Sequence, residues 1–280
     1  MITLDFDKAL DKVKVNQTVT EPIIYLDNWA INLFIQDLDL RTELIELLRK
    51  KQATWALSLI NIIEIVNRID SSQVKEIKNL IDSVNTVTII TIPAEAINVE
   101  KEGRPFPFDD GLIKTIASIY DPDKGIYTPG EIQISKSIQL FIDDPSLKDQ
   151  LPSGGLTELI NPSIKKARED EVKFQEIKTH YRNRLDPLPI PCTDYLYRRA
   201  FEFVVLDGKE MKESEWNDFC HTVVPLSYCD FVLIDKRWRT FVEQAQTGWP
   251  HIANAYKESE LSQFFTDLES FKYNRRHEYF

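Results

Sequence analysis

The chain has 280 residues, of which 42% are hydrophobic and 28% are charged, a composition that excludes collagen-like, low-complexity and wholly disordered proteins. Its length allows one large domain or two small ones. There are 34 Lys and Arg residues against 45 Asp and Glu residues, giving a formal net charge of -11. Any contact with a polyanion must therefore be local, because a basic coat over the whole surface is excluded.

Cysteine usage and hydropathy indicate the cellular compartment in which the protein is expected. The three cysteines form no CxxC motif and no Cys/His array, so neither a secreted disulfide scaffold nor structural zinc is indicated. The first residues carry mixed charges from residue 5 onward, and no apolar run approaches the roughly 18 residues that span a bilayer. We expect a soluble cytoplasmic protein without a membrane partner.

The first predicted elements alternate between strand and helix. Residues 1–20 are polar and mixed, and are expected to form an amphipathic lead-in. Ile23–Leu26 is a short apolar run that predicts a buried strand ending at Asp27, with a helix after Asn28. Residues 54–66 predict a strand that breaks into a helix. Residues 71–84 predict a helix capped by Ser71 or Ser72, and residues 87–92 predict a β-branched strand.

The middle of the chain is punctuated by Pro and Gly, and the pattern is weaker. Helical periodicity recurs there at residues 110–120, 131–143, 156–185 and 193–206. We interpret residues 95–211 as a mostly helical insertion. The whole chain, 1–280, is then a single domain whose core comprises about 21–94 and 212–272.

The last part of the chain returns to alternating elements. A helix ended by Pro225 is predicted at residues 213–223 and a strand at 231–234. An amphipathic helix follows at 237–245, then a final strand at 251–256 and a closing helix at 259–271. Strands that alternate with helices in this way indicate an α/β fold with a parallel sheet.

Carboxylates stand out by their positions. Asp27 and Asp235 each close a predicted strand, and ligands of open parallel sheets gather at the carboxyl ends of strands. Glu64 interrupts the apolar run NIIEIVN, where an unpaired carboxylate is costly to bury. Asp218 lies on the helix before the strand that ends at Asp235. We expect these four acids to converge on one crevice.

Four converging carboxylates repel one another unless a cation binds between them. Hard oxygen ligands suit Mg²⁺ or Mn²⁺ rather than zinc. Such a site polarises a phosphoryl group and activates a water molecule. The cluster therefore favours hydrolysis of phosphodiester bonds.

Three segments together resemble the PIN-like nuclease domain: IIYLDNWAINLFI, LSLINIIEIVN and NDFCHTVVPLSYCDFVLIDKRW. The resemblance covers about 21–92 and 212–272. It implies a three-layer α/β/α core with a mainly parallel sheet of about five strands, interrupted by the large helical insertion. It also implies that four acids hold Mg²⁺ or Mn²⁺ and carry catalysis: Asp27, Glu64, Asp218 and Asp235. Asn28 would orient the first acid, and His221 follows Asp218 in a D-x-x-H pattern.

The function that the resemblance implies is a metal-dependent endoribonuclease, in which a metal-activated water hydrolyses RNA. One alternative is a catalytically degenerate PIN-like module that binds nucleic acid or protein. Another is the toxin component of a toxin–antitoxin pair, which would add an inhibitory protein partner.

Each acid also has a structural interpretation. Asp27 and Asn28 are good helix N-caps, Glu64 and Asp218 could be solvated helix residues, and Asp235 could be a turn residue. Asp230 lies at the other end of the predicted strand, roughly 16 Å from Asp235, and is expected to be structural.

Local basic clusters could supply phosphate contacts. Lys236 and Arg237 directly follow Asp235, and Trp238 beside them could stack on a base or pack inward. His221 could orient an acid or be a packed, hydrogen-bonded core residue. The C-terminal segment FKYNRRHEYF could dock on a partner or fray.

Overall fold

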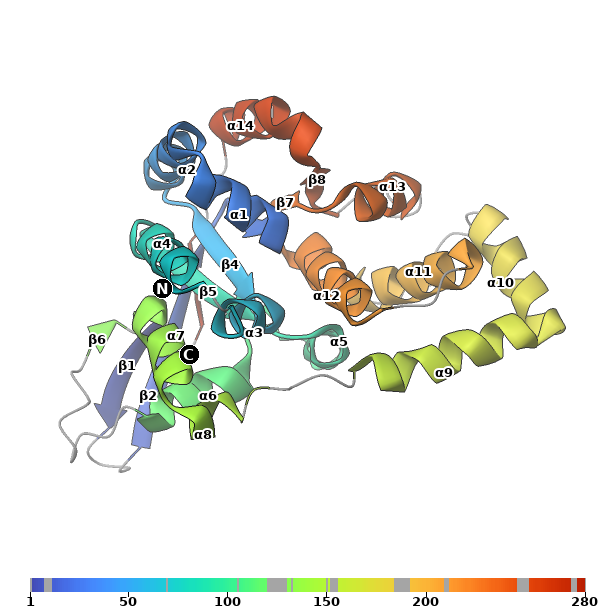
Figure 1. Ribbon diagram of the computed structural model, residues 1–280, viewed down its shortest axis with the longest axis horizontal. Helices are drawn as coiled ribbons and strands as arrows, with labels where there is room; N and C mark the ends of the chain where they lie inside the picture. Colours follow the sequence, from blue (N-terminus) through green and yellow to red (C-terminus); the bar gives the residue numbers. More distant parts are fainter. Residues whose placement is uncertain are drawn as a thin grey trace.

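The computed structural model describes most of the chain, namely residues 2–7, 12–68, 70–104, 106–119, 130–131, 133–149, 151, 156–183, 192–208, 212–245, 252–272 and 276–279. Figure 1 shows two sheets surrounded by helices, with an arm of helices extending to one side. None of the described helices combines the length and the apolarity needed to cross a membrane.

The N-terminal residues form a sheet rather than a lead-in. Strands β1 (Ile2–Asp7) and β2 (Lys12–Thr20) pair antiparallel, and β2 also pairs with the C-terminal strand β9 (Arg276–Tyr279). A two-residue strand, β6 (Gly130–Glu131), completes the order β6-β1-β2-β9. The alternation of VKVNQTVT is the pattern of a strand, and it corrects our prediction for residues 1–20. Within the C-terminal segment FKYNRRHEYF, residues 276–279 form a strand of this sheet.

The main sheet has five parallel strands and confirms the predicted α/β class. The strands are β3 (Ile23–Leu26), β4 (Thr54–Ser58), β5 (Thr86–Ile90), β7 (Phe231–Leu233) and β8 (Asn254–Tyr256), in the order β5-β4-β3-β7-β8. From β3 the chain builds the sheet first toward β4 and β5, and later toward β7 and β8. The order therefore reverses between β3 and β7, which is where open parallel sheets bind their ligands.

Helices cover both faces of this sheet (Figure 1). The core elements are α1 (Asn28–Gln36), α2 (Leu38–Lys51), α3 (Leu59–Val66), α4 (Ser71–Asp82), α12 (Glu213–Tyr228), α13 (Lys236–Ala245), the short 3₁₀ helix η2 (Glu258–Glu260) and α14 (Leu261–Ser270). Their apolar faces and the strands form one buried cluster.

Three predicted boundaries change for identifiable reasons. Helix α4 is capped by Asp70, whose carboxylate accepts from the Ser72 and Gln73 amides, so neither Ser71 nor Ser72 is the cap. Strand β4 stops at Ser58 because this residue begins α3 in a reciprocal capping box with Asn61. Helix α12 continues past Pro225 to Tyr228.

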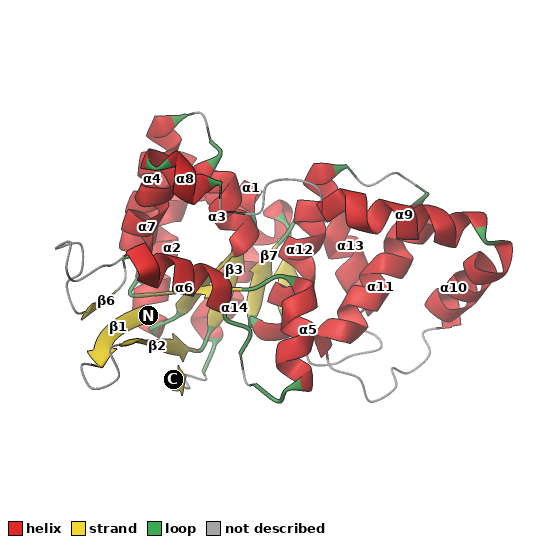
Figure 2. Cartoon of the chain, turned by 90° about the horizontal axis from the view of Figure 1, so that it is seen from below, coloured by secondary structure: helices red, strands yellow, loops and turns green. Residues whose placement is uncertain are grey.

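The predicted insertion separates into two groups of helices. Its elements are α5 (Pro93–Lys101), α6 (Asp110–Ile119), α7 (Ile134–Asp143), α8 (Pro145–Lys148), α9 (Leu156–Glu169), α10 (Glu171–Asn183) and α11 (Cys192–Asp207). Helix α7 packs on α3 and α4, whereas α9 to α11 form the arm that meets the core at α5 and α12 (Figure 2). The single helix expected at 156–185 is broken at Asp170, whose carboxylate accepts from the Lys173 amide.

Candidate functional site

The four predicted acids lie at the carboxyl edge of the parallel sheet. Asp27 directly follows β3, and its amide donates to the Leu233 carbonyl of β7 at 3.0 Å, so it lies where the strand order reverses. Asp235 follows β7, and Glu64 lies on α3, the helix that begins at the end of β4. Asp218 lies on α12, one helical turn from His221.

Asp27 is almost fully buried and is held by its own helix. Its Oδ1 accepts from the Asn28 amide at 2.5 Å and lies 3.8 Å from Nε2 of His221. Burial raises the pKa of Asp27, and the charges of Glu64 and Asp235 raise it further. The charge of His221 and the hydrogen bond from the Asn28 amide lower this pKa, but the net shift is upward. The charges of two of the other predicted acids therefore act on Asp27.

Asn28 contacts the site in a different way from the one predicted. Its backbone amide, rather than its side chain, contacts Asp27, while its side-chain oxygen accepts from the guanidinium of Arg68. Arg68 also donates to Asn32 at 2.7 Å and to Gln73 at 3.0 Å. Burial lowers the pKa of Arg68 and the charge of Glu64 opposes that shift. Arg68 thus places a cation beside the acids, and sequence reasoning missed it.

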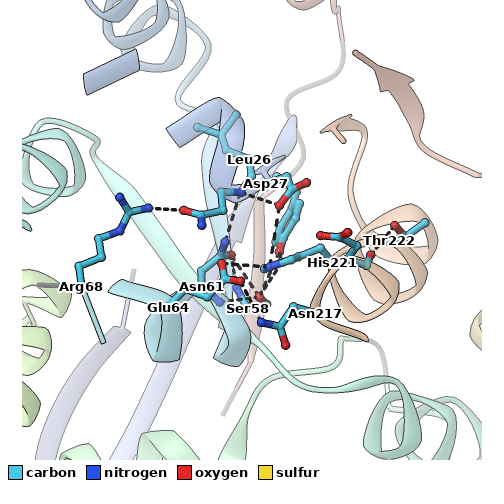
Figure 3. Close-up of polar contacts among 12 residues, drawn as sticks. Leu26, Asp27, Ser58, Asn61, Glu64, Arg68, Asn217, His221 and Thr222 are labelled. Atoms are coloured by element: carbon cyan, nitrogen blue, oxygen red, sulfur yellow. Dashed lines mark hydrogen bonds and ion pairs between the residues drawn. The ribbon is translucent and has the colours of Figure 1, made fainter. Parts of the chain in front are cut away.

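His221 is the centre of the cluster (Figure 3). Its Nε2 lies 3.3 Å from Oε2 of Glu64, and its Nδ1 contacts the Tyr25 hydroxyl and lies 3.4 Å from Oγ of Ser58. Burial lowers the pKa of His221, but the charges of Asp27 and Glu64 outweigh it and leave the pKa raised. The raised pKa favours the protonated imidazole, which lies next to both carboxylates, so His221 is both a packed core residue and a neighbour of the acids.

Glu64 is positioned by two side chains of α12. Its Oε1 accepts from the side-chain amide of Asn217 on α12 at 3.0 Å, and its Oε2 faces His221. Asn217 and His221 are four residues apart, so they share one face of α12 and both reach α3. Asn217 lies four residues before His221 in the sequence, which is the spacing of one helical turn. This spacing is the signal by which sequence analysis could have identified Asn217.

Asp218 and Asp235 complete the group and are both half-buried. Burial, then the charges of Asp27 and Asp235, raises the pKa of Asp218 to about 7. Asp235 also caps α13, because its Oδ1 accepts from the Trp238 amide at 3.0 Å. The charges of Asp27, Asp235 and Glu64 thus all act on Asp218, and convergence of the four acids on one cation stays a prediction. At the opposite end of β7, the Asp230 carboxylate accepts from the Ile23 amide at 2.7 Å, in keeping with the predicted structural role.

The raised pKa of Asp218 predicts how its replacement changes stability. A carboxyl whose pKa is raised by folding destabilises the protein when ionised, so stability falls as the pH rises from about 4 to about 7. Asp218→Asn removes this loss. In EDTA at pH 8 we expect a gain of about 1–2 kcal/mol, reduced by partial solvent screening, and no gain at pH 4. Urea unfolding at the two pH values measures it, and an equal effect at both would contradict the crowding of acids.

The basic segment after Asp235 is largely neutralised. Arg237 donates to Glu215 at 2.5 Å and to Asp207 at 2.9 Å, and Arg239 contacts Glu260 at 3.2 Å. Trp238 is 1% exposed and packs against the rings of three phenylalanines, at 203, 219 and 241. The sequence left two interpretations of Trp238 open. Its inward packing is confirmed, and stacking on a base is wrong. Lys236 alone in this segment is exposed.

The donor set can be compared with what a divalent cation requires. By type, the oxygens of Asp27, Glu64, Asp218 and Asp235 fit Mg²⁺ or Mn²⁺. Burial first, and then the charges of Asp27 and Asp235, raise the pKa of Asp218 to about 7, and a cation would relieve the repulsion among these carboxylates. By arrangement, no group of three or more His, Cys, Asp or Glu side chains in the described part of the chain is placed to hold a metal ion. His221 supplies positive charge between two of the donors.

Comparison with known proteins adds no relative. No protein-family model, no curated protein and no solved structure matches this chain.

Proposed function

We propose that the protein is a metal-dependent endoribonuclease with a PIN-like core. The observation that carries the proposal is the gathering of four carboxylates, from four separate elements, at the point where a parallel sheet reverses its strand order. Hydrolysis of a phosphodiester needs positive charge at the phosphoryl oxygens and a deprotonated water, and a bound divalent ion supplies both.

The side chains have separate roles in this proposal. Asp27, Glu64, Asp218 and Asp235 would hold Mg²⁺ or Mn²⁺. Asn217 and His221 hold the Glu64 carboxylate in place through their contacts with its two oxygens. Among the cations of the segment after Asp235, the exposed Lys236 is the one available for a phosphate, because Arg237 is held by two carboxylates.

A second function is favoured by one observation. Because the described side chains do not form a ready metal-ligand group, the same core would also suit a degenerate module that binds RNA without cutting it. An inhibitory protein partner, as in a toxin–antitoxin pair, would be compatible with the nuclease.

The two functions are separated by product analysis. Purified protein is incubated with single-stranded RNA in Mg²⁺, in Mn²⁺ and in EDTA, and the termini of the products are mapped. We expect cleavage only with a divalent cation, and no 2′,3′-cyclic phosphate, because water rather than the 2′-hydroxyl attacks phosphorus. Intact RNA in every buffer, together with measurable RNA binding, would favour the binding module. Cleavage that persists in EDTA would contradict a metal-dependent enzyme.

A further inference from the structure

A large cavity adjoins the acidic edge of the sheet. Its volume is about 800 Å³, within the range of roughly 300–1,000 Å³ typical of small-molecule sites. It lies between the arm helices α9 to α11 and the core helices α5 and α12, and it is lined at one end by Ile92, Pro93 and Ala94. These three residues begin two positions after Ile90, the last residue of β5, so this part of the lining lies at the same carboxyl edge of the sheet that bears the acids.

Three aromatic side chains line the cavity: Tyr197, Phe201 and Trp216. Tyr197 and Phe201 are partly exposed, so part of each ring remains accessible. Trp216 is buried and stacks on Phe219, with 5.1 Å between ring centroids. Accessible aromatic rings in a concave apolar site suit a flat, aromatic ligand, because each base of a nucleic acid has a face that can stack on them.

The charged residues of the lining do not form a phosphate site. Arg198 is held by Asp194 through two hydrogen bonds of 2.8 and 3.0 Å, and His180 contacts Glu202 at 2.6 Å. The ammonium of Lys173 has no ion-pair or hydrogen-bond partner among the described residues, and Lys173 is exposed. Arg198 and His180 are therefore already engaged by carboxylates, and the exposed Lys173 is the lining residue best placed to contact a phosphate.

Helix α12 links the cavity to the acids. Trp216 and Asp218 are two residues apart, about 200° around the helix, so they lie on nearly opposite sides of its N-terminal part. An α-helix with its side chains is only about 10–12 Å across. A short stretch of single-stranded RNA that crosses the helix would place one phosphate at the acids and a base a few nucleotides away in the cavity.

We propose that the cavity binds one unpaired base of single-stranded RNA, a few nucleotides from the scissile phosphate, and that Phe201 stacks on this base. The inference rests on the proposed function, because it names the substrate class of that site. It makes duplex RNA a poor ligand, since a paired base cannot enter.

The test uses full-length protein carrying Asp27→Asn, so that RNA stays intact, and an end-labelled single-stranded oligoribonucleotide. One abasic position is moved along the strand and the Kd is measured by fluorescence anisotropy. We expect one position to weaken binding about five- to 100-fold, the range for loss of one base–aromatic stack. Phe201→Leu should weaken the intact strand to a similar extent, and it should not weaken binding further when the sensitive position is already abasic.

Matched controls keep the result specific. Val172→Ala changes an exposed apolar residue outside the cavity, and Lys166→Ala removes an exposed cation of α9 outside it; both should bind like the parent. Lys173→Ala should weaken binding and reduce its salt dependence. Thermal melts of each variant verify that the protein is folded.

The outcomes distinguish this inference from the proposed function. If Phe201→Leu binds the intact strand like the parent and the abasic scan is flat, the base-binding cavity is wrong, whether or not RNA is cut. If the scan shows one sensitive position that Phe201→Leu abolishes, the cavity assignment stands, even when the unmodified protein cuts no RNA and the nuclease proposal fails.

Discussion

Asp27→Asn is expected to lower the rate of RNA cleavage by at least about 1,000-fold, equivalent to roughly 4 kcal/mol of transition-state stabilisation. Asp27 lies at the reversal of strand order, its carboxylate is buried, and it is charge-coupled to Glu64 and Asp235. An amide has almost the same shape and keeps an oxygen that can accept from the Asn28 amide. The variant should therefore fold while losing a charged ligand for the metal. Single-turnover cleavage of a labelled RNA measures the effect.

Asp230→Asn is the matched control for this substitution. Asp230 lies just before β7, at the opposite end of the strand from Asp235, and its carboxylate accepts from the Ile23 amide. Its replacement changes the net charge by the same amount without touching the acidic edge, so cleavage should stay near the parent rate. Equal rates for parent and Asp27→Asn, or equal losses in the two variants, would contradict the assigned site.

His221→Leu is expected to lower the free energy of unfolding by about 3–5 kcal/mol at pH 7 without added metal, the usual cost of breaking a buried ion pair. His221 is 1% exposed, and its imidazole is the positive group between the carboxylates of Asp27 and Glu64. Leucine fills a similar volume but leaves both acids uncompensated. Urea unfolding measures the loss, and saturating Mn²⁺ should stabilise the variant more than the parent, because the ion supplies the missing charge.

His180→Leu provides the comparison for this second substitution. His180 also contacts a carboxylate, that of Glu202, but its side chain is 46% exposed, so its loss should cost less than about 1 kcal/mol. If the two variants lose the same stability, or if Mn²⁺ stabilises them equally, His221 is not the countercharge of the acidic cluster.

The main sheet and the positions of its acids were predictable because each depends on local pattern. β3, β4 and β5 are short apolar runs, the first two ending at the capping residues Asp27 and Ser58, and Asp27 and Asp235 lie at strand ends. Parallel strands share one direction, so strand-end residues meet at one edge whatever the strand order. Glu64 was identifiable because a carboxylate in an apolar run needs a partner.

The second sheet and the details of the site depend on contacts between distant segments. β2 pairs with β9 at the other end of the chain, and no local signal names that partner. The contacts of Tyr25 and Asn217 with the His221 and Glu64 side chains arise from packing of α12 on α3 and the sheet. Trp238 could not be placed from its own segment, because its burial depends on the helices that cover α13.

Growing crystals in saturating Mn²⁺ and locating the ion by its anomalous scattering is the most direct test of the metal site. We expect a peak at the carboxyl edge of the parallel sheet, within about 2.0–2.6 Å of oxygens from at least two of Asp27, Glu64, Asp218 and Asp235. The Asp27→Asn protein, crystallised in the same way, should show a weaker peak or none. Parent crystals with no Mn²⁺ at this edge, or with the ion bound only elsewhere, would contradict the metal-dependent nuclease.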